Sequence, residues 1–229
     1  MCFSASVSFS ASAVLAAIGL VSVSSATSPA SRLFAATPLL FAAQQFGEGL
    51  VWITIPDVRA GMPHQLSVYF FLIVALIVWP VWLPFSLEHT ELSIPHRRML
   101  RALRHFGIGV AIVSAGILVS NRPDAHILGH SLHYDFGGTH GPIVSTMMLV
   151  AYLISTLIPL FVSTANYARQ IGVMLVVSVI AAFYVQRQDL TSVWCFFSAL
   201  LSGSILFAVR HASSATLRQV PLAVPVEEW

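Results

Sequence analysis

The chain has 229 residues, of which 57% are hydrophobic and only 9% are charged, and its mean hydropathy is +0.83. A soluble domain carries roughly 25% charged residues, so this composition excludes an ordinary soluble protein and indicates a polytopic membrane protein in contact with lipids. The net charge of +2 is too small to indicate a nucleic-acid partner, and the absence of lysine excludes a retinal Schiff base.

Seven apolar stretches approach the ~20 residues that a membrane-spanning helix needs. They are residues 7–25, 33–55, 66–87, 100–120, 143–162, 171–185 and 190–209. They predict an all-α membrane protein: a seven-transmembrane-helix bundle over residues 1–211 and a short cytoplasmic tail over residues 212–229. Pro80 and Pro84 should kink the third helix near its exit end. No segment has the alternation of a strand, so we expect none.

The arginines predict the orientation of this bundle. With seven spans, one side of the membrane receives eight arginines and the other side receives three. Because cytoplasmic loops carry the excess of basic residues, the N-terminus should lie outside and the C-terminus in the cytoplasm. The first stretch lacks the positive region of a signal peptide, so we expect it to be a retained helix.

The second stretch carries polar residues at a depth where they are costly. A carboxylate at mid-membrane costs roughly 3 kcal/mol on insertion scales, so Glu48 is a functional candidate, either catalytic or metal-ligating. In a helix Gln44, Glu48 and Trp52 share one stripe, and Gln45 lies at its edge. The alternative is structural: a neutral Glu48 hydrogen-bonded to the two glutamines, holding two helices together.

A histidine-rich connection precedes the fifth stretch. Four of the nine histidines fall within residues 126–140. Pro123-Asp124 and Gly137-Gly138 are typical of the start and stop of a short helix. Such a helix would align His126, His130 and Tyr134 and place His133 beside them, and histidines four apart can chelate one metal ion. The alternative is a hydrated loop in which the histidines are merely polar.

The predicted topology brings these residues to the same outer half of the bundle. Cys2 and Cys195 should lie there too, together with His140 and Glu48. Zinc accepts cysteine, histidine and glutamate, which makes it the expected metal among the transition metals that this set could hold. A disulfide between the two cysteines is an equally ordinary alternative in an oxidising compartment.

The connection that runs from Glu88 to Arg98 also combines acidic residues and histidines. Glutamate and histidine there could bind a metal. The adjacent arginines favour a different interpretation: an interfacial, salt-bridged turn that faces anionic lipid head groups.

Several short motifs support a family resemblance. The chain opens with Met-Cys-Phe-Ser-Ala, and the second stretch holds Gln-x-x-Glu-x-x-x-Trp at Gln45, Glu48 and Trp52. Three further motifs are Glu88 ahead of Arg97-Arg98, His130-x-x-x-Tyr134 followed by His140-Gly141, and Ser192-x-Trp194-Cys195. Over nearly its whole length the chain resembles a bacterial family of uncharacterised polytopic membrane proteins. This resemblance implies a bacterial inner (plasma) membrane location and this topology, and it implies no activity.

Three functions fit these observations. The first is a metal-binding membrane protein, with a metal-dependent hydrolase acting on a small molecule or lipid as its enzymatic form. Its predicted ligands are Glu48, His126, His130, His140, Cys2 and Cys195, supported by Gln44, Gln45, Trp52 and Tyr134. The second is a proton- or cation-coupled transporter that uses Glu48. The third is a non-enzymatic sensor or assembly protein. Burial favours a neutral Glu48, whereas a metal ion would keep it ionised.

Overall fold

The structure, a computed structural model, describes residues 4–55, 61–128, 131–136, 142–185 and 201–210, and it is mostly helical. Its helices are α1 (Ala5–Ser25), α2 (Pro29–Ala35), α3 (Thr37–Thr54), α4 (Gly61–Ile73), the π-helix η1 (Val74–Val78), α5 (Trp79–Thr90), α6 (Ile94–Asn121), α7 (Pro142–Val162), α8 (Asn166–Val185) and the helical segment Leu201–Arg210. Two short strands, β1 (Asp124–Leu128) and β2 (Ser131–Asp135), connect α6 towards α7.

Four helices within the described chain are long and apolar enough to cross a membrane, which indicates a membrane protein. They are α1, the continuous Gly61–Thr90 formed by α4, η1 and α5, α6, and Val144–Val162 of α7. Two shorter apolar helices, Tyr167–Ile180 and Leu201–Arg210, overlap the sixth and seventh predicted stretches. The seven-span topology and the orientation of the termini therefore stay predictions.

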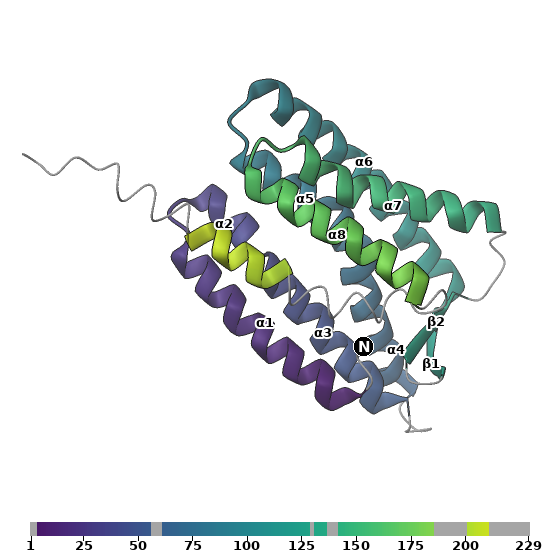
Figure 1. Ribbon diagram of the computed structural model, residues 1–229. Helices are drawn as coiled ribbons and strands as arrows, with labels where there is room; N and C mark the ends of the chain where they lie inside the picture. Colours follow the sequence, from purple (N-terminus) through teal and green to yellow (C-terminus); the bar gives the residue numbers. More distant parts are fainter. Residues whose placement is uncertain (1–3, 56–60, 129–130, 137–141, 186–200, 211–229) are drawn as a thin grey trace, which may run out of the picture.

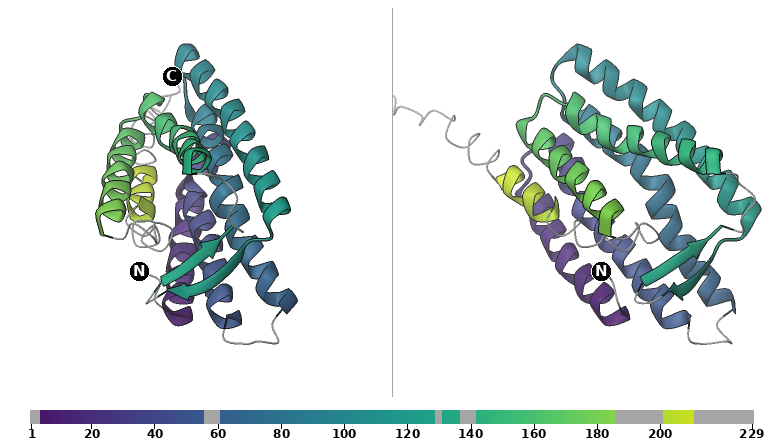
Figure 2. Two further views of the ribbon diagram at one scale, coloured as in Figure 1. Left: turned by 90° about the vertical axis from the view of Figure 1, so that its right-hand side faces the viewer. Right: turned by 45° about the vertical axis from the view of Figure 1, so that its right-hand side comes forward.

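The bundle has two distinct ends, which Figure 1 shows. The β1–β2 hairpin lies at one end, named the hairpin end, beside the start of α4. The turns from α5 to α6 and from α7 to α8 lie at the other end, named the arginine end because the α5–α6 turn leads into Arg97, Arg98, Arg101 and Arg104. Figure 2 shows the hairpin at the same end from two further directions.

The second predicted span is broken rather than continuous. Ser28 caps α2 through a reciprocal capping box with Ser31. The helix then ends at Ala35 with Ala36 as its C-cap, and α3 begins at Thr37 with Pro38 in its first turn. Proline has no N–H to lose at a helix start, so the sequence Thr-Pro is suited to begin the second helix. As a result, the polar residues of this stretch all belong to α3.

Two prolines shape the long helix Gly61–Thr90. Pro80 has no N–H to give to the preceding turn, and the turn directly before it is the π-helix η1. The hydroxyl of Tyr152 in α7 donates to the carbonyl oxygen of Ala75 at 2.9 Å, which compensates for the missing donor. Pro84 likewise leaves the carbonyl of Pro80 without a helical partner, and a Cβ at Gly107 of α6 would overlap that oxygen. Only glycine therefore fits at position 107.

The histidine-rich connection forms a hairpin, so the predicted helix between Pro123 and Gly137 is wrong. The two strands pair antiparallel, with Asp124 opposite Asp135 and His126 opposite His133. Polar and apolar residues alternate along both strands, as expected where one face is covered, and in the sequence only Gly129-His130 stands between the two strands. A two-residue connection that begins with glycine between alternating segments is a hairpin signal. Because the strands occur, the expectation of no strand is also wrong.

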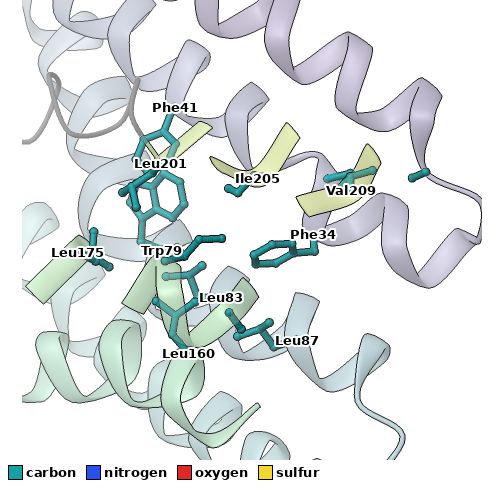
Figure 3. Packing of buried hydrophobic residues seen from close by; sticks show 14 of the residues in the cluster. Phe34, Phe41, Trp79, Leu83, Leu87, Leu160, Leu175, Leu201, Ile205 and Val209 are labelled. Carbon is teal, nitrogen blue, oxygen red and sulfur yellow. The ribbon is translucent and has the colours of Figure 1, made fainter. Parts of the chain in front are cut away.

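Buried apolar side chains form two clusters along the bundle. The first lies towards the arginine end and includes Phe41, Trp79 and Leu83, together with side chains of the segment Leu201–Arg210 (Figure 3). The second lies towards the hairpin end and includes Phe71 and Tyr134. Along α3 and along Gly61–Thr90 the chain passes from one cluster to the other, and polar residues of α3 occupy the level between them.

Candidate functional site

The candidate site is the polar cluster of α3, formed by Gln44, Gln45 and Glu48. Their exposed fractions are 2%, 1% and 1%, so all three side chains are inside the protein. The Gln45 Nε2 group donates to Glu48 Oε2 at 3.3 Å, and the indole N–H of Trp79 donates to Gln44 Oε1 at 2.7 Å. These bonds hold the carboxylate and one amide in fixed positions. The predicted stripe on one face of a helix is therefore a buried polar layer.

Small residues let the neighbouring helices approach this layer. A Cβ at Gly47 would lie 2.6 Å from the ring of Phe70 in α4, and one at Gly49 would lie 2.7 Å from the ring of Phe9 in α1. Both distances are shorter than a carbon–carbon contact allows, so glycine permits α1, α3 and α4 to pack around Glu48.

The polar layer lies at the level of the π-helix. Residues of α3 on either side of it belong to different apolar clusters, with Ala42 in the first and Val51 in the second. On the opposing helix the change falls between Ala75 and Trp79, which is where η1 runs. Single π-helical turns inside α-helices occur frequently at functional sites because they displace side chains and free carbonyl groups.

Trp52 and Tyr134 lie above this layer, towards the hairpin end. The Trp52 side chain packs against the second apolar cluster, and its buried indole N–H has no hydrogen-bond acceptor among the described residues. The ring of Tyr134 stacks on Phe71, with centroids 4.7 Å apart and planes 6° apart. The hairpin thus contributes Tyr134 to the apolar cluster on the hairpin side of the polar layer that contains Glu48.

A hydrogen-bonded chain leads from the surface into the hairpin end. Asp124 Oδ1 lies 2.9 Å from His64 Nε2, and His64 Nδ1 lies 3.0 Å from the hydroxyl of Thr54, which is 3.2 Å from that of Ser67. The side chain of Asp124 is 68% exposed, that of His64 is 17% exposed, and Ser67 is buried. Thr54 follows Glu48 by six residues, or about 9 Å along the helix axis. The chain therefore ends within two helical turns of the buried carboxylate.

The structure separates some predicted ligands and leaves others undescribed. His126 is exposed on the outer face of the hairpin, whereas Glu48 is buried inside the bundle, so the two do not share one site. Four further predicted ligands, Cys2, His130, His140 and Cys195, lie outside the described residues. Within the described part of the chain no group of three histidine, cysteine, aspartate or glutamate side chains is placed to hold a metal ion.

The arginine end has a denser set of polar contacts. Glu88 pairs with Arg101 Nε at 2.8 Å and with Arg104 Nη1 at 2.9 Å, which agrees with the salt-bridged turn expected there. Glu91 accepts hydrogen bonds from the backbone N–H and hydroxyl of Thr164, the hydroxyl of Ser163 and the backbone N–H of Ser93. The α5–α6 turn is thereby fastened to the α7–α8 turn.

Glu91 lies outside the spanning helices, and its hydrogen bonds shift the pKa of its carboxyl. Burial raises the pKa of its carboxyl, but the hydrogen bonds from Thr164, Ser93 and Ser163 lower it more, so the pKa lies below its ordinary value of 4.5. Sequence reasoning missed this contact because its partner is 73 residues away. The only local signal is a Ser-Thr pair before a helix start.

Comparison with known proteins identifies a family. The model of a family of unknown function (DUF6629) matches residues 1–220. The chain belongs to this family. No curated protein and no solved structure matches the chain significantly. Membership agrees with the resemblance to an uncharacterised family, and it assigns no activity to the residues described above.

Proposed function

We propose that this protein, located in a bacterial inner membrane, binds a cation at Glu48. The observation that carries the proposal is the polar layer between the two apolar clusters, where the carboxylate is 1% exposed and accepts a hydrogen bond from Gln45. A buried carboxylate within a membrane protein marks an ion or proton pathway more often than a packing contact. Gln45 presents its amide N–H to this carboxylate and the Gln44 oxygen accepts from Trp79, so the ligands proposed here are the carboxylate oxygens of Glu48.

The bound cation is either a transition-metal ion or a proton, and the ligands around Glu48 decide between them. Oxygen ligands alone suit a proton or a hard cation. If the predicted His130, His140, Cys2 and Cys195 join Glu48, the nitrogen, sulfur and oxygen ligands match those that zinc accepts.

A metal-dependent hydrolase would also need a water-filled space beside the metal ion. The cavity between Trp79, Leu175 and Ile205 has an almost wholly apolar wall and a volume of about 20 Å³. That is close to the smallest volume that holds a single water molecule.

The metal arm is tested on detergent-purified protein by elemental analysis and by the shift in melting temperature on adding Zn²⁺. We expect bound metal in the wild type and stabilisation by added Zn²⁺, of about 2.7 kcal/mol at a concentration 100-fold above the dissociation constant. Glu48→Gln should lose both, because the amide supplies no negative charge. Glu88→Gln is the matched control, since Glu88 is also buried but pairs with arginines.

The result that overturns the metal arm is a metal-free wild type with no response to Zn²⁺. If Glu48→Gln in addition melts at the wild-type temperature and changes no transport, Glu48 is a structural hydrogen-bonding residue and the whole proposal is wrong.

Proton-coupled transport is the second candidate function, and one observation favours it. The chain Asp124–His64–Thr54 links solvent to the interior through an imidazole, which takes up a proton on one nitrogen and releases one from the other. Proteoliposomes that contain a pH-sensitive dye measure this activity. Glu48→Gln should abolish proton flux, and His64→Ala should slow it. Flux that is unchanged in Glu48→Gln removes this candidate.

A further inference from the structure

The solvent-facing side of the β1–β2 hairpin carries two histidines opposite each other. His126 of β1 pairs directly with His133 of β2 in the antiparallel register. Side chains alternate between the two faces of a strand, so the buried Ala125, Leu132 and Tyr134 occupy the inner face. The two histidines therefore occupy the other face, where His126 is exposed. Neither histidine belongs to the polar layer around Glu48.

The distance between the two rings fits a shared metal ion. Their centroids lie 5.1 Å apart and their planes are inclined by 53°. With metal–nitrogen bonds of about 2.0–2.1 Å and a near-tetrahedral angle, two imidazoles that share one ion have centroids roughly 5 Å apart. Directly opposed residues of an antiparallel pair have Cβ atoms about 4.5–5.5 Å apart, so the backbone itself sets this spacing.

We propose that His126 and His133 form a transition-metal site on the outer face of the hairpin, distinct from the site at Glu48. Imidazole nitrogen suits Cu²⁺, Zn²⁺ and Ni²⁺, with Cu²⁺ bound most tightly of the three. The two protein ligands leave the remaining coordination positions to water. A structural zinc site has four protein ligands, so this site is open and exchangeable, as a site that captures a metal ion from solution must be.

The charges around the histidine pair favour a cation. Asp124 and Asp135 oppose each other at the next register position on the same face. Asp124 accepts from the backbone N–H of Ala125 and contacts His64, so its carboxylate is held in place beside the pair. Carboxylates near ligating histidines raise the local concentration of cations. They also favour the metal-bound state, in which the imidazoles are neutral.

The experiment uses the full-length protein in detergent, with Cu²⁺ as the spectroscopic probe and Zn²⁺ as the competitor. The electron paramagnetic resonance spectrum of bound Cu²⁺ should show coupling to two nitrogens. His126→Ala or His133→Ala should reduce the pattern to one nitrogen and weaken Cu²⁺ binding at least roughly 10-fold, the lower limit seen when even an outer-shell partner is lost. Zn²⁺ in excess should displace Cu²⁺ from the wild type.

His105→Ala is the matched control, because His105 is an exposed histidine on α6, away from the hairpin. It should leave the affinity and the two-nitrogen spectrum unchanged. An unchanged Cu²⁺ affinity in the His126→Ala, His133→Ala double variant overturns the proposal. Failure of the Glu48 site is distinguishable, since Glu48→Gln should leave the two-nitrogen spectrum intact while abolishing the interior binding.

Discussion

The two ends of the bundle use their polar residues in different ways. At the arginine end, Glu88 forms ion pairs with two arginines of α6 and Glu91 accepts four hydrogen bonds, so each carboxylate has several charged or hydrogen-bonding partners. At the hairpin end, by contrast, an exposed aspartate contacts a histidine that leads inward, and the buried indole N–H of Trp52 has no acceptor among the described residues.

This difference separates structural from functional polar groups. A carboxylate that is fully paired fixes geometry, and its removal should be felt as lost stability. A histidine between a solvated carboxylate and a hydroxyl can change its protonation without breaking the fold. The arginine end should therefore respond to substitution in its melting temperature, whereas the hairpin end should respond in binding or transport.

The largest expected effect comes from removing the partners of Glu88. Arg101→Ala combined with Arg104→Ala leaves a buried carboxylate unpaired, which typically costs about 3–5 kcal/mol. For a protein of this size that corresponds to a fall in melting temperature of roughly 10 °C. The control is Arg97→Ala combined with Arg98→Ala in the same helix, where exposed side chains should cost about 0.5 kcal/mol or less. Equal losses in the two double variants would remove the distinction between paired and solvated arginines.

A smaller loss, dependent on pH, is expected from Glu91→Gln. The substitution exchanges one acceptor oxygen for a donor, and a hydrogen bond to a charged group is worth about 1.5–3 kcal/mol. The folded-state pKa of Glu91 is lowered, so its contribution to stability is present above the ordinary pKa of 4.5 and is lost as the pH falls through the lower folded value.

Melting curves from pH 7 down to pH 3 measure this contribution. The wild type should be more stable than Glu91→Gln at pH 7, and the difference should shrink at the acid end. A difference that is constant over the whole range would show that the carboxylate charge is not involved.

A third prediction addresses the middle of the bundle, between the two ends. Tyr152→Phe removes the donor to the carbonyl of Ala75 and should cost about 1 kcal/mol. If the hydroxyl replaces the N–H that Pro80 lacks, Pro80→Ala should restore a helical donor and reduce this cost. A double-mutant cycle on the two positions measures the coupling. Strict additivity would show that the tyrosine and the proline act independently.

The sequence predicted the parts of this molecule that depend on local pattern. Apolar length located the helices, and the position of Glu48 in an apolar stretch predicted that its side chain is buried. Periodicity within one helix was sufficient because Gln44, Gln45 and Glu48 lie on the same helix. Trp79, the partner of Gln44, could not be predicted, since it is 35 residues away and its orientation depends on the π-helix.

The hairpin is a segment in which two local signals conflict. Histidines four apart fit the helical period, whereas the alternation in Asp-Ala-His-Ile-Leu and Ser-Leu-His-Tyr-Asp has the period of a strand, and the strand forms. That change of period exchanges the partners: His126 faces His133 rather than aligning with His130. The contact of Glu91 with Thr164 depends on the packing of whole helices, and the Ser-Thr pair before α8 does not identify a partner 73 residues away.

The smallest expected effect on stability is that of Asp124→Asn at the hairpin end. Asparagine keeps the shape of the side chain and an oxygen acceptor for the N–H of Ala125, and it removes the charge beside His64. Exposed ion pairs contribute about 0.2–1 kcal/mol, so the melting temperature should fall by no more than about 4 °C. If His64 relays protons towards Glu48, the loss of the neighbouring carboxylate should nevertheless slow proton flux in proteoliposomes, because it removes the surface group that passes protons to the imidazole.

The comparison variant is Arg101→Ala combined with Arg104→Ala, with flux measured at a temperature at which the variant is still folded. It should show the reverse pattern, a large loss of stability and unchanged flux. A variant Asp124→Asn that destabilises the protein as strongly as the arginine pair would instead show that the hairpin is held in place by this contact, and that both ends of the bundle are structural.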